Sequence, residues 1–333
     1  MSTNRTVFVI GSNSFSGSDL IDHLLSASDY NVIGVSRSPE KSDLFLPYKK
    51  NANQRRFRYF QYDVNHDMAA ICALLAVERP MYVVNFAAQS EVAPSWVNPE
   101  EWFQTNAVAV STLTNFLRKQ LWLEKYVHIS SPEVYGTCDG AVTEDANINP
   151  TTPYAASKAA GDLVLLALAK TLGFRLVLVR STNVYGAHQQ LHKIIPRAAI
   201  YLRMKRPIDL HGGGEAVKSF IHIRDVSRGE QAIMERGRVG EIYHIAPDAG
   251  VRVRQVVEHM CGLRGADFKA ATRFVEERPG QDRAYVIDSS KARSELGWKP
   301  TIELSQGISE LVSCIDLEWE RIQSSPLEYV DKP

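Results

Sequence analysis

The alternation of two residue patterns in the first half of the chain constrains its fold more than any other feature. Short runs rich in β-branched and aromatic residues recur at residues 6–10, 31–35, 57–62, 82–86, 125–129 and 175–179. Helical periodicity fills the stretches between them, most clearly at 17–26, 102–117 and 153–172. Strands joined by helical crossovers form parallel sheets covered on both faces. The pattern therefore predicts an α/β fold, a Rossmann-like doubly wound parallel sheet.

The charge and cysteine content exclude several classes of protein. Lys and Arg together number 38, and Asp and Glu together also number 38, so the formal net charge is zero. A balanced chain gives no basis for nucleic acid or an anionic membrane as a partner. The cysteines are scattered without a CxxC pair, which argues against a zinc site or a disulfide framework. From the cysteine pattern we expect no bound metal. No apolar run is long enough for a signal sequence or a membrane span, so we expect a cytoplasmic protein.

The first strand-like run leads into a turn that suits a pyrophosphate. Residues 11–17 read Gly-Ser-Asn-Ser-Phe-Ser-Gly and run directly into a helical pattern. A helix N-terminus presents free N–H groups and the positive end of a dipole, and both bind phosphate. We expect Gly11 to permit the tight turn, Gly17 to permit close helix packing, and Ser14 and Phe15 to lie beside the phosphates. Ser14 stands at the middle-glycine position of a G-x-x-G-x-x-G pattern, so an ordinary strand–helix connection is the alternative.

The ends of the next strands offer contacts for the rest of a dinucleotide. An acid after the second strand binds the ribose hydroxyls of NAD, whereas an arginine accommodates the additional phosphate of NADP. Arg37 follows that strand and no acid does, so we expect NADP or NAD, with Arg37 favouring NADP. Asp63, after the third strand, is a candidate for hydrogen bonding the adenine. Ala87, after the fourth, would let the backbone lie against the cofactor. An arginine exposed in a loop is the alternative explanation of Arg37.

The alternation becomes irregular after residue 180. Glycines and prolines interrupt it, although 220–223 and 242–245 have strand character and could return to the main sheet. We therefore predict two units: an NAD(P)-binding Rossmann domain, residues 1–180 plus roughly 215–246, and a smaller discontinuous C-terminal substrate-binding cap, residues 181–214 and 247–333.

The helical pattern that starts at residue 153 carries a tyrosine–lysine pair. Tyr154 and Lys158 are one helical turn apart and share a face. A phenol is too weak an acid to act as a base near neutral pH unless its anion is stabilised, and a lysine ammonium one turn away would stabilise it. Such pairs also occur in helices without any catalytic role. The context favours catalysis, because Ser130 and Ser131 follow the fifth strand, where a third catalytic hydroxyl belongs.

These motifs together resemble the extended short-chain dehydrogenase/reductase family. The Gly11 turn, the Asn-Phe-Ala-Ala run at 85–88, the serine pair and the tyrosine–lysine pair have the order and spacing of that family, over nearly the whole chain. Within the family the chain looks most like nucleotide-sugar 4,6-dehydratases, such as the dTDP-glucose and GDP-mannose dehydratases. The similarity is carried by residues 130–136 (Ser-Ser-Pro-Glu-Val-Tyr-Gly), 180–186 (Arg-Ser-Thr-Asn-Val-Tyr-Gly) and 278–283 (Arg-Pro-Gly-Gln-Asp-Arg).

The resemblance implies a reaction on a nucleotide-diphosphate sugar. Carbon 4 would be oxidised, water would be lost across carbons 5 and 6, and the hydride would return to carbon 6, so that the cofactor is recycled and stays tightly bound. The residues that it assigns to catalysis are Ser131, Glu133, Tyr154 and Lys158, of which Tyr154 and Lys158 would also bind the cofactor. The residues that it assigns to the substrate are Gln89, Ser90, Asn183, Lys193, Lys218 and Arg278. Relatives are commonly homodimers, and we expect a homodimer here.

Pro132 departs from the family pattern and leaves the reaction open. The dTDP-glucose dehydratases have an aspartate there that protonates the departing hydroxyl, whereas the GDP-mannose enzymes have a serine and still eliminate. UDP-glucuronate decarboxylases also carry a glutamate at the Glu133 position, and many 4-epimerases carry a small apolar residue at 132. An NDP-sugar 4-epimerase and a UDP-glucuronate decarboxylase therefore stay as alternatives. A non-catalytic NAD(P)-binding sensor protein is a third, which the presence of Ser131, Tyr154 and Lys158 disfavours.

Overall fold

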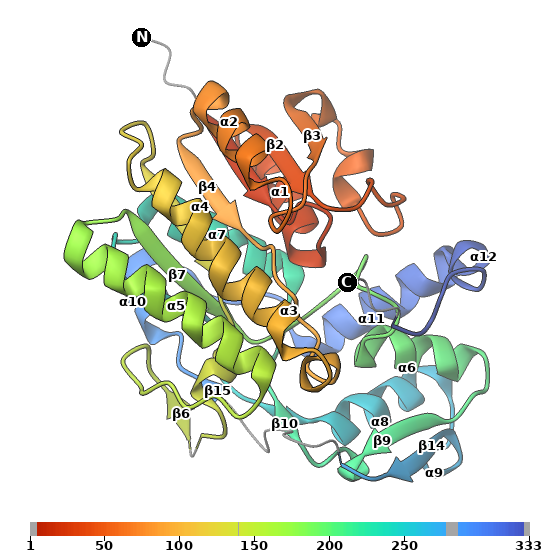
Figure 1. Ribbon diagram of the computed structural model, residues 1–333. Helices are drawn as coiled ribbons and strands as arrows, with labels where there is room; N and C mark the ends of the chain where they lie inside the picture. Colours follow the sequence, from red (N-terminus) through yellow and green to blue (C-terminus); the bar gives the residue numbers. More distant parts are fainter. Residues whose placement is uncertain (1–4, 139, 278–285, 330–333) are drawn as a thin grey trace.

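A seven-stranded parallel sheet forms the centre of the computed structural model, which describes residues 5–138, 140–277 and 286–329. The strand order is β12-β7-β5-β4-β1-β2-β3, and every neighbouring pair is parallel (Figure 1). The strands are β1 (Thr6–Ile10), β2 (Asn31–Ser36), β3 (Phe57–Gln61), β4 (Tyr82–Asn85), β5 (Lys125–Ile129), β7 (Leu176–Ser181) and β12 (Ile242–Ile245). The predicted doubly wound sheet is confirmed.

Alternate residues of the central strand β1 point into two different cores. Val7 and Val9 pack with three helices on one face: α1 (Phe15–Ala27), α7 (Ile223–Arg236) and α10 (Ser290–Leu296). Phe8 and Ile10 pack with three on the other: α2 (Met68–Glu78), α4 (Val110–Leu117) and α5 (Pro153–Leu172). Helices α4 and α5 cross the front of the sheet side by side (Figure 1). Because both faces are covered, all five residues of β1 are buried, as is typical of a parallel sheet.

The predicted helix at 102–117 contains a π-helical segment. The chain begins as α3 (Pro99–Phe103), widens into a π-helix at Gln104–Ala109 and continues as α4. The wide segment packs closely on α5, where a Cβ on Gly161 would lie 2.3 Å from the carbonyl oxygen of Asn106. π-helical turns are frequent at functional sites.

A second hydrophobic core lies beside the sheet (Figure 1). It is built by α6 (Ile194–Arg203), α8 (Val253–Arg264) and α11 (Leu304–Leu317), joined by Leu44 from the loop after β2. The short helices around it are α9 (Phe268–Ala271) and α12 (Trp319–Ile322). Among the described residues, no helix is long and apolar enough to cross a membrane.

Short two-stranded sheets surround the central one and correct one strand prediction. The pairs are β8 (Asn183–Tyr185) with β11 (Phe220–His222), β9 (Ile208–His211) with β14 (Thr272–Val275), β10 (Val217–Lys218) with β13 (Val251–Arg252), and β6 (Ala141–Val142) with β15 (Val286–Ile287). The strand expected at 242–245 joins the main sheet, but the one expected at 220–223 does not. The physical reason is that β7 is already flanked by β5 and β12, so it has no open edge for β11. The domain boundaries stay a prediction. Helix α10 packs on the central sheet, although its residues lie in the range 247–333 that we expected to belong to the cap.

Candidate functional site

The turn after β1 has the close backbone approach that a phosphate cradle requires. Gly11 has a φ of +86°, and a Cβ there would lie 2.7 Å from the backbone nitrogen of Ala87. A Cβ on Gly17 would lie 2.5 Å from the carbonyl oxygen of Gly11. Ser14 has a φ of −73°, which any residue adopts, so the absence of the middle glycine does not strain the turn. Its hydroxyl accepts a hydrogen bond from the N–H of Gly17 at 3.0 Å and caps α1.

A cavity of about 420 Å³ opens at this turn. It lies at the carboxyl ends of β1, β2 and β4, where the order of the strands reverses and doubly wound sheets bind their ligands. Arg37, Asp63 and Ala87 all line it. Phe15 does not, because its side chain is buried in the core under α1, which leaves only its backbone beside the turn.

Asn13, which lines this cavity, has a buried side-chain oxygen without a hydrogen-bond partner among the described residues. The side-chain amide of Asn13 donates to the carbonyl oxygens of Ser38 and Pro39 at 2.9 and 3.0 Å. Its Oδ1 is buried and has no hydrogen-bond partner among the residues that the structure describes. An unpaired buried acceptor is unfavourable unless a bound molecule donates to it. The orphaned atom and the glycine cradle together fit a dinucleotide.

A short 3₁₀ helix after β5, Pro132–Tyr135, positions the predicted base. Ser131 caps it, because its hydroxyl accepts from the N–H of Glu133 at 3.2 Å. Pro132 stands at the first helical position, where a missing N–H breaks no bond, and its ring is buried. The residue that departs from the family pattern therefore suits the turn that it occupies. Glu133 lines a larger cavity of about 1000 Å³.

Tyr154 and Lys158 lie on the buried face of α5, and their side chains are 9% and 2% exposed. Burial raises the pKa of Tyr154 well above its ordinary value, the charge of Glu133 raises it further, and the neighbouring hydroxyl of Ser131 opposes the shift. Burial also lowers the pKa of Lys158 to about 8, against the effect of Asp162. The Lys158 ammonium donates to the carbonyl of Ile129 at 2.8 Å. Deprotonation of this phenol requires additional positive charge, which an oxidised nicotinamide ring would bring.

A buried ion pair beneath these residues was not predicted. Asp162, one turn after Lys158, accepts from the hydroxyl of Ser130 and from the guanidinium of Arg180, each at 2.7 Å. Ser130 is thereby engaged in the interior, and Ser131 is the serine that faces Tyr154. The spacing of Asp162 from Lys158 on one helix face is the only signal in the sequence that could have indicated it.

Asn106, in the π-helical segment, is a second residue that the sequence did not indicate. Its Oδ1 accepts from the backbone N–H of Gln89 at 3.0 Å, and its Nδ2 donates to the carbonyl oxygen of Gln89 and to Ser157 Oγ, both at 2.9 Å. It thus fixes the loop after β4 to α5. A polar residue inside an amphipathic helix gives no sequence signal of this role.

The larger cavity lies between the sheet and the second core and brings together several predicted substrate residues. Asn183, Lys193 and Lys218 line it, Gln89 lines the smaller cavity, and Ser90 lines both. The two cavities are therefore adjacent. Arg278 and the 278–283 motif lie outside the described residues.

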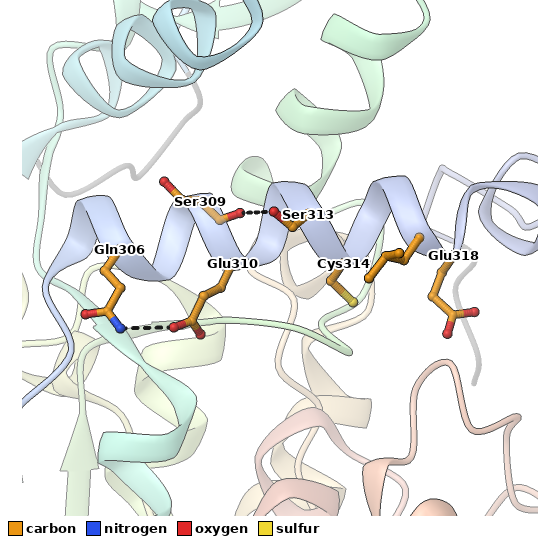
Figure 2. Close-up of a pocket in the computed structure, with 7 residues that line it drawn as sticks. Gln306, Ser309, Glu310, Ser313, Cys314 and Glu318 are labelled. Atoms are coloured by element: carbon orange, nitrogen blue, oxygen red, sulfur yellow. Dashed lines mark hydrogen bonds between the residues drawn. The ribbon is translucent and has the colours of Figure 1, made fainter.

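A further hollow of about 490 Å³ lies on the surface of α11 (Figure 2). All of its lining residues belong to α11 or directly follow it. The side-chain amide of Gln306 donates to the carboxylate of Glu310, and the hydroxyl of Ser313 donates to the backbone carbonyl of Ser309. Because one side of a single helix forms the whole lining, we assign it no part in the site.

A parallel sheet with a glycine cradle at its switch point and a buried tyrosine–lysine pair defines an enzyme of the short-chain dehydrogenase class. The family model described as GDP-mannose 4,6 dehydratase matches residues 8–311. The chain therefore belongs to this family of extended short-chain dehydrogenases, and the predicted resemblance is confirmed.

Individual relatives agree with the family. The dTDP-glucose 4,6-dehydratase of Haemophilus influenzae is 30% identical, with 92% of this chain and 96% of that protein covered. A solved dTDP-glucose 4,6-dehydratase from Streptomyces venezuelae, with NAD bound, superposes with a TM-score of 0.87 and 30% identity over 97% of this chain and all of that one. A UDP-glucuronic acid 4-epimerase from Bacillus cereus, also with NAD, gives a TM-score of 0.85, 26% identity and coverages of 94% and 99%. The chain spans 46% of the length of a matching trifunctional dehydratase of Arabidopsis thaliana.

Proposed function

We propose that the chain is a nucleotide-sugar 4,6-dehydratase that converts an NDP-hexose into an NDP-4-keto-6-deoxyhexose. The observation that carries this is the position of Glu133. It lines the substrate cavity and acts electrostatically on Tyr154, so a base for carbon 5 stands beside the base for carbon 4.

The residues then divide the reaction between them. Tyr154 takes the proton of the carbon 4 hydroxyl, Ser131 hydrogen-bonds the same oxygen, and Lys158 supplies positive charge beneath the phenol. A dinucleotide held by the Gly11–Gly17 turn would supply the hydride chemistry, taking up the hydride of carbon 4 and giving it back at carbon 6. Glu133 removes the proton of carbon 5 and, since Pro132 has none to give, passes a proton to the departing carbon 6 hydroxyl, directly or through bound water. A proton then returns to carbon 5, so the net change is loss of one water.

For the cofactor we propose NADP or NAD, tightly bound and recycled, held by the Gly11–Gly17 turn, Arg37, Asp63 and Ala87. Both solved relatives described above contain NAD, whereas Arg37 at the end of β2 supports NADP. Denatured protein should release a nicotinamide nucleotide, and Arg37→Asp should shift the ratio of affinities from NADP toward NAD. An unchanged ratio would remove Arg37 from the site.

We also propose a cytoplasmic homodimer that pairs through α3, the π-helical segment and α5. Phe103, Val108 and Leu163 are large apolar side chains exposed on these adjacent helices, and burying them against a second copy would be favourable. Sedimentation analysis tests the stoichiometry, and Leu163→Glu should shift it toward the monomer.

Glu133→Gln decides the reaction class. In a dehydratase this variant should oxidise carbon 4 and then stop, so that reduced cofactor accumulates, visible by its absorbance, and mass spectrometry finds no product lighter by one water. A 4-epimerase is the second candidate, supported by the Bacillus cereus structure and by Pro132. It needs no base at carbon 5, so full turnover by Glu133→Gln would favour it. Glu295→Gln, a surface carboxylate paired with Arg238, is the matched control.

A further inference from the structure

A carboxylate that no motif indicated stands where the two cavities meet. Glu91 lines both of them, and its side chain is 22% exposed. Its Oε1 accepts from the ammonium of Lys193 at 2.6 Å and lies 3.4 Å from Nε2 of His192. No residue of 5–138, 140–277 or 286–329 bonds to Oε2, and this atom is not sealed from solvent. One oxygen is therefore anchored and the other is available to a ligand.

The anchoring fixes both the position and the charge of Glu91. Burial alone would raise the pKa of this carboxyl, but His192 and Lys193 outweigh burial and hold it at about 2. His192 is itself fixed, because its ring packs edge-on against Tyr329 at a centroid distance of 5.3 Å. Glu91 is thus an ionised acceptor with little freedom to turn away.

Cations and carboxylates both line the large cavity. Arg197 and Lys218 suit a diphosphate, whereas Lys193 is paired with Glu91. The charges of Glu133 and Glu91 both act on the Tyr154 phenol and raise its pKa. The part of a substrate that reacts at Tyr154 therefore lies near two carboxylates, where a sugar hydroxyl is a good hydrogen-bond donor and a sugar carboxylate is repelled.

We propose that Glu91 selects a neutral hexose over a hexuronic acid: its Oε2 accepts a hydrogen bond from a sugar hydroxyl, and its charge disfavours a substrate carboxylate. This rests on the proposed function, whose substrates already carry a hydroxyl rather than a carboxylate at carbon 6, and it names the residue that enforces this choice in binding. Glu91 would also distinguish the chain from relatives that act on glucuronic acid. Glu133 does not make that distinction, because UDP-glucuronate decarboxylases carry a glutamate at the same position.

The test is the binding of three ligands to the holoenzyme and to its Glu91→Gln variant by calorimetry. The ligands are a nucleoside diphosphate, its glucose derivative and its glucuronic acid derivative, with uracil or thymine as the base, whichever diphosphate binds more tightly. The amide keeps the size of the side chain but removes its charge. Releasing Lys193 from its carboxylate would itself attract a sugar carboxylate, so the comparison is repeated in a Lys193→Met background, where the ratio of glucose to glucuronic acid reports the charge of Glu91 alone.

We expect the wild type to favour the glucose derivative by ~10-fold or more, and Glu91→Gln to reduce that preference by about 10-fold, the scale of one charge–charge interaction. Glu328→Gln is the matched control, since Glu328 lines the same cavities but bonds to Tyr201 at 3.1 Å and should leave the ratio unchanged. Equal binding of the two sugars by the wild type, or the same ratio in both proteins, overturns the proposal. Tyr154→Phe is introduced into both proteins to stop turnover during the titration, so a failure of the dehydratase reaction alone appears separately, as normal selectivity here without loss of water in the protein that keeps Tyr154.

Discussion

The sheet and the second core contribute to the cleft in different ways. On the sheet side, functional residues follow strand ends directly: Gly11 after β1, Arg37 after β2 and Ser131 after β5. On the other side, Lys193 precedes α6 and Lys218 lies on the two-residue strand β10. The first set is aligned by a single sheet and the second by packing among separate elements. This difference suggests that the sheet side carries the chemistry and the second core carries affinity for the diphosphate.

The sharpest test of this division is Tyr154→Phe. Removing the general base on the sheet side should lower kcat by about 10²–10⁴-fold, while leaving the dissociation constant of the nucleotide sugar nearly unchanged. The phenyl ring fills the same buried space as the tyrosine ring, so circular dichroism should match the wild type. Steady-state kinetics and calorimetry on the same preparation give both numbers. Turnover near that of the wild type would contradict the assignment of Tyr154.

The stability of the sheet side should depend on the buried ion pair of Asp162 and Arg180. Asp162→Ala leaves the buried guanidinium of Arg180 without its carboxylate, and breaking such a pair destabilises a protein by about 3–5 kcal/mol. Urea unfolding should report this loss. The exposed pair of Arg5 and Asp29 gives the control, because Asp29→Ala should change stability by less than ~1 kcal/mol. Equal effects of the two substitutions would mean that Asp162 is not structurally important.

A substitution on the second core should affect affinity and spare the chemistry. Lys218→Ala removes one positive charge from the large cavity and should raise KM by ~10-fold, with kcat within about 3-fold of the wild type. Lys218→Arg keeps the charge and should restore most of the affinity. If kcat of Lys218→Ala fell as much as that of Tyr154→Phe, the second core would contribute to the chemistry as well as to affinity, which would contradict the proposed division.

The smallest expected effect concerns a second buried carboxyl on the sheet side. Glu230, on α7, is buried, and neither of its oxygens has a partner among the described residues. Burial raises its pKa well above 4.5, with Asp19 adding to the shift, so the folded state keeps a proton that the unfolded state loses. The stability of the wild type should therefore fall as the pH rises above about 4.5. The glutamine of Glu230→Gln does not titrate. The free energy of unfolding of this variant, measured in urea relative to that of the wild type, should therefore increase by ~1–2 kcal/mol between pH 5 and pH 8. A pH-independent difference would contradict this account.

Much of the sheet side could be predicted because its signals are local. Strand-like runs are contiguous, and each predicted cofactor residue stands within a few positions of a strand end, so the topology of a parallel sheet brings them to one edge. The helix at 153–172 and its tyrosine–lysine pair were predicted at the bounds that α5 has. Ser14 shows the limit of such reasoning, because its role as the cap of α1 depends on a backbone conformation that the pattern does not specify.

The sequence by itself thus determined the parallel sheet, the tight turn at Gly11 and the position of Tyr154 and Lys158 on one face of a helix, because hydrophobic periodicity and spacing along one helix are properties of neighbouring residues. Only the tertiary structure decided that Glu91 meets Lys193, 102 positions later, and that β11 pairs with β8 rather than with the sheet. Such contacts depend on which surfaces are buried together once the chain has packed. No local pattern encodes them, because each partner on its own looks like an ordinary polar or strand residue.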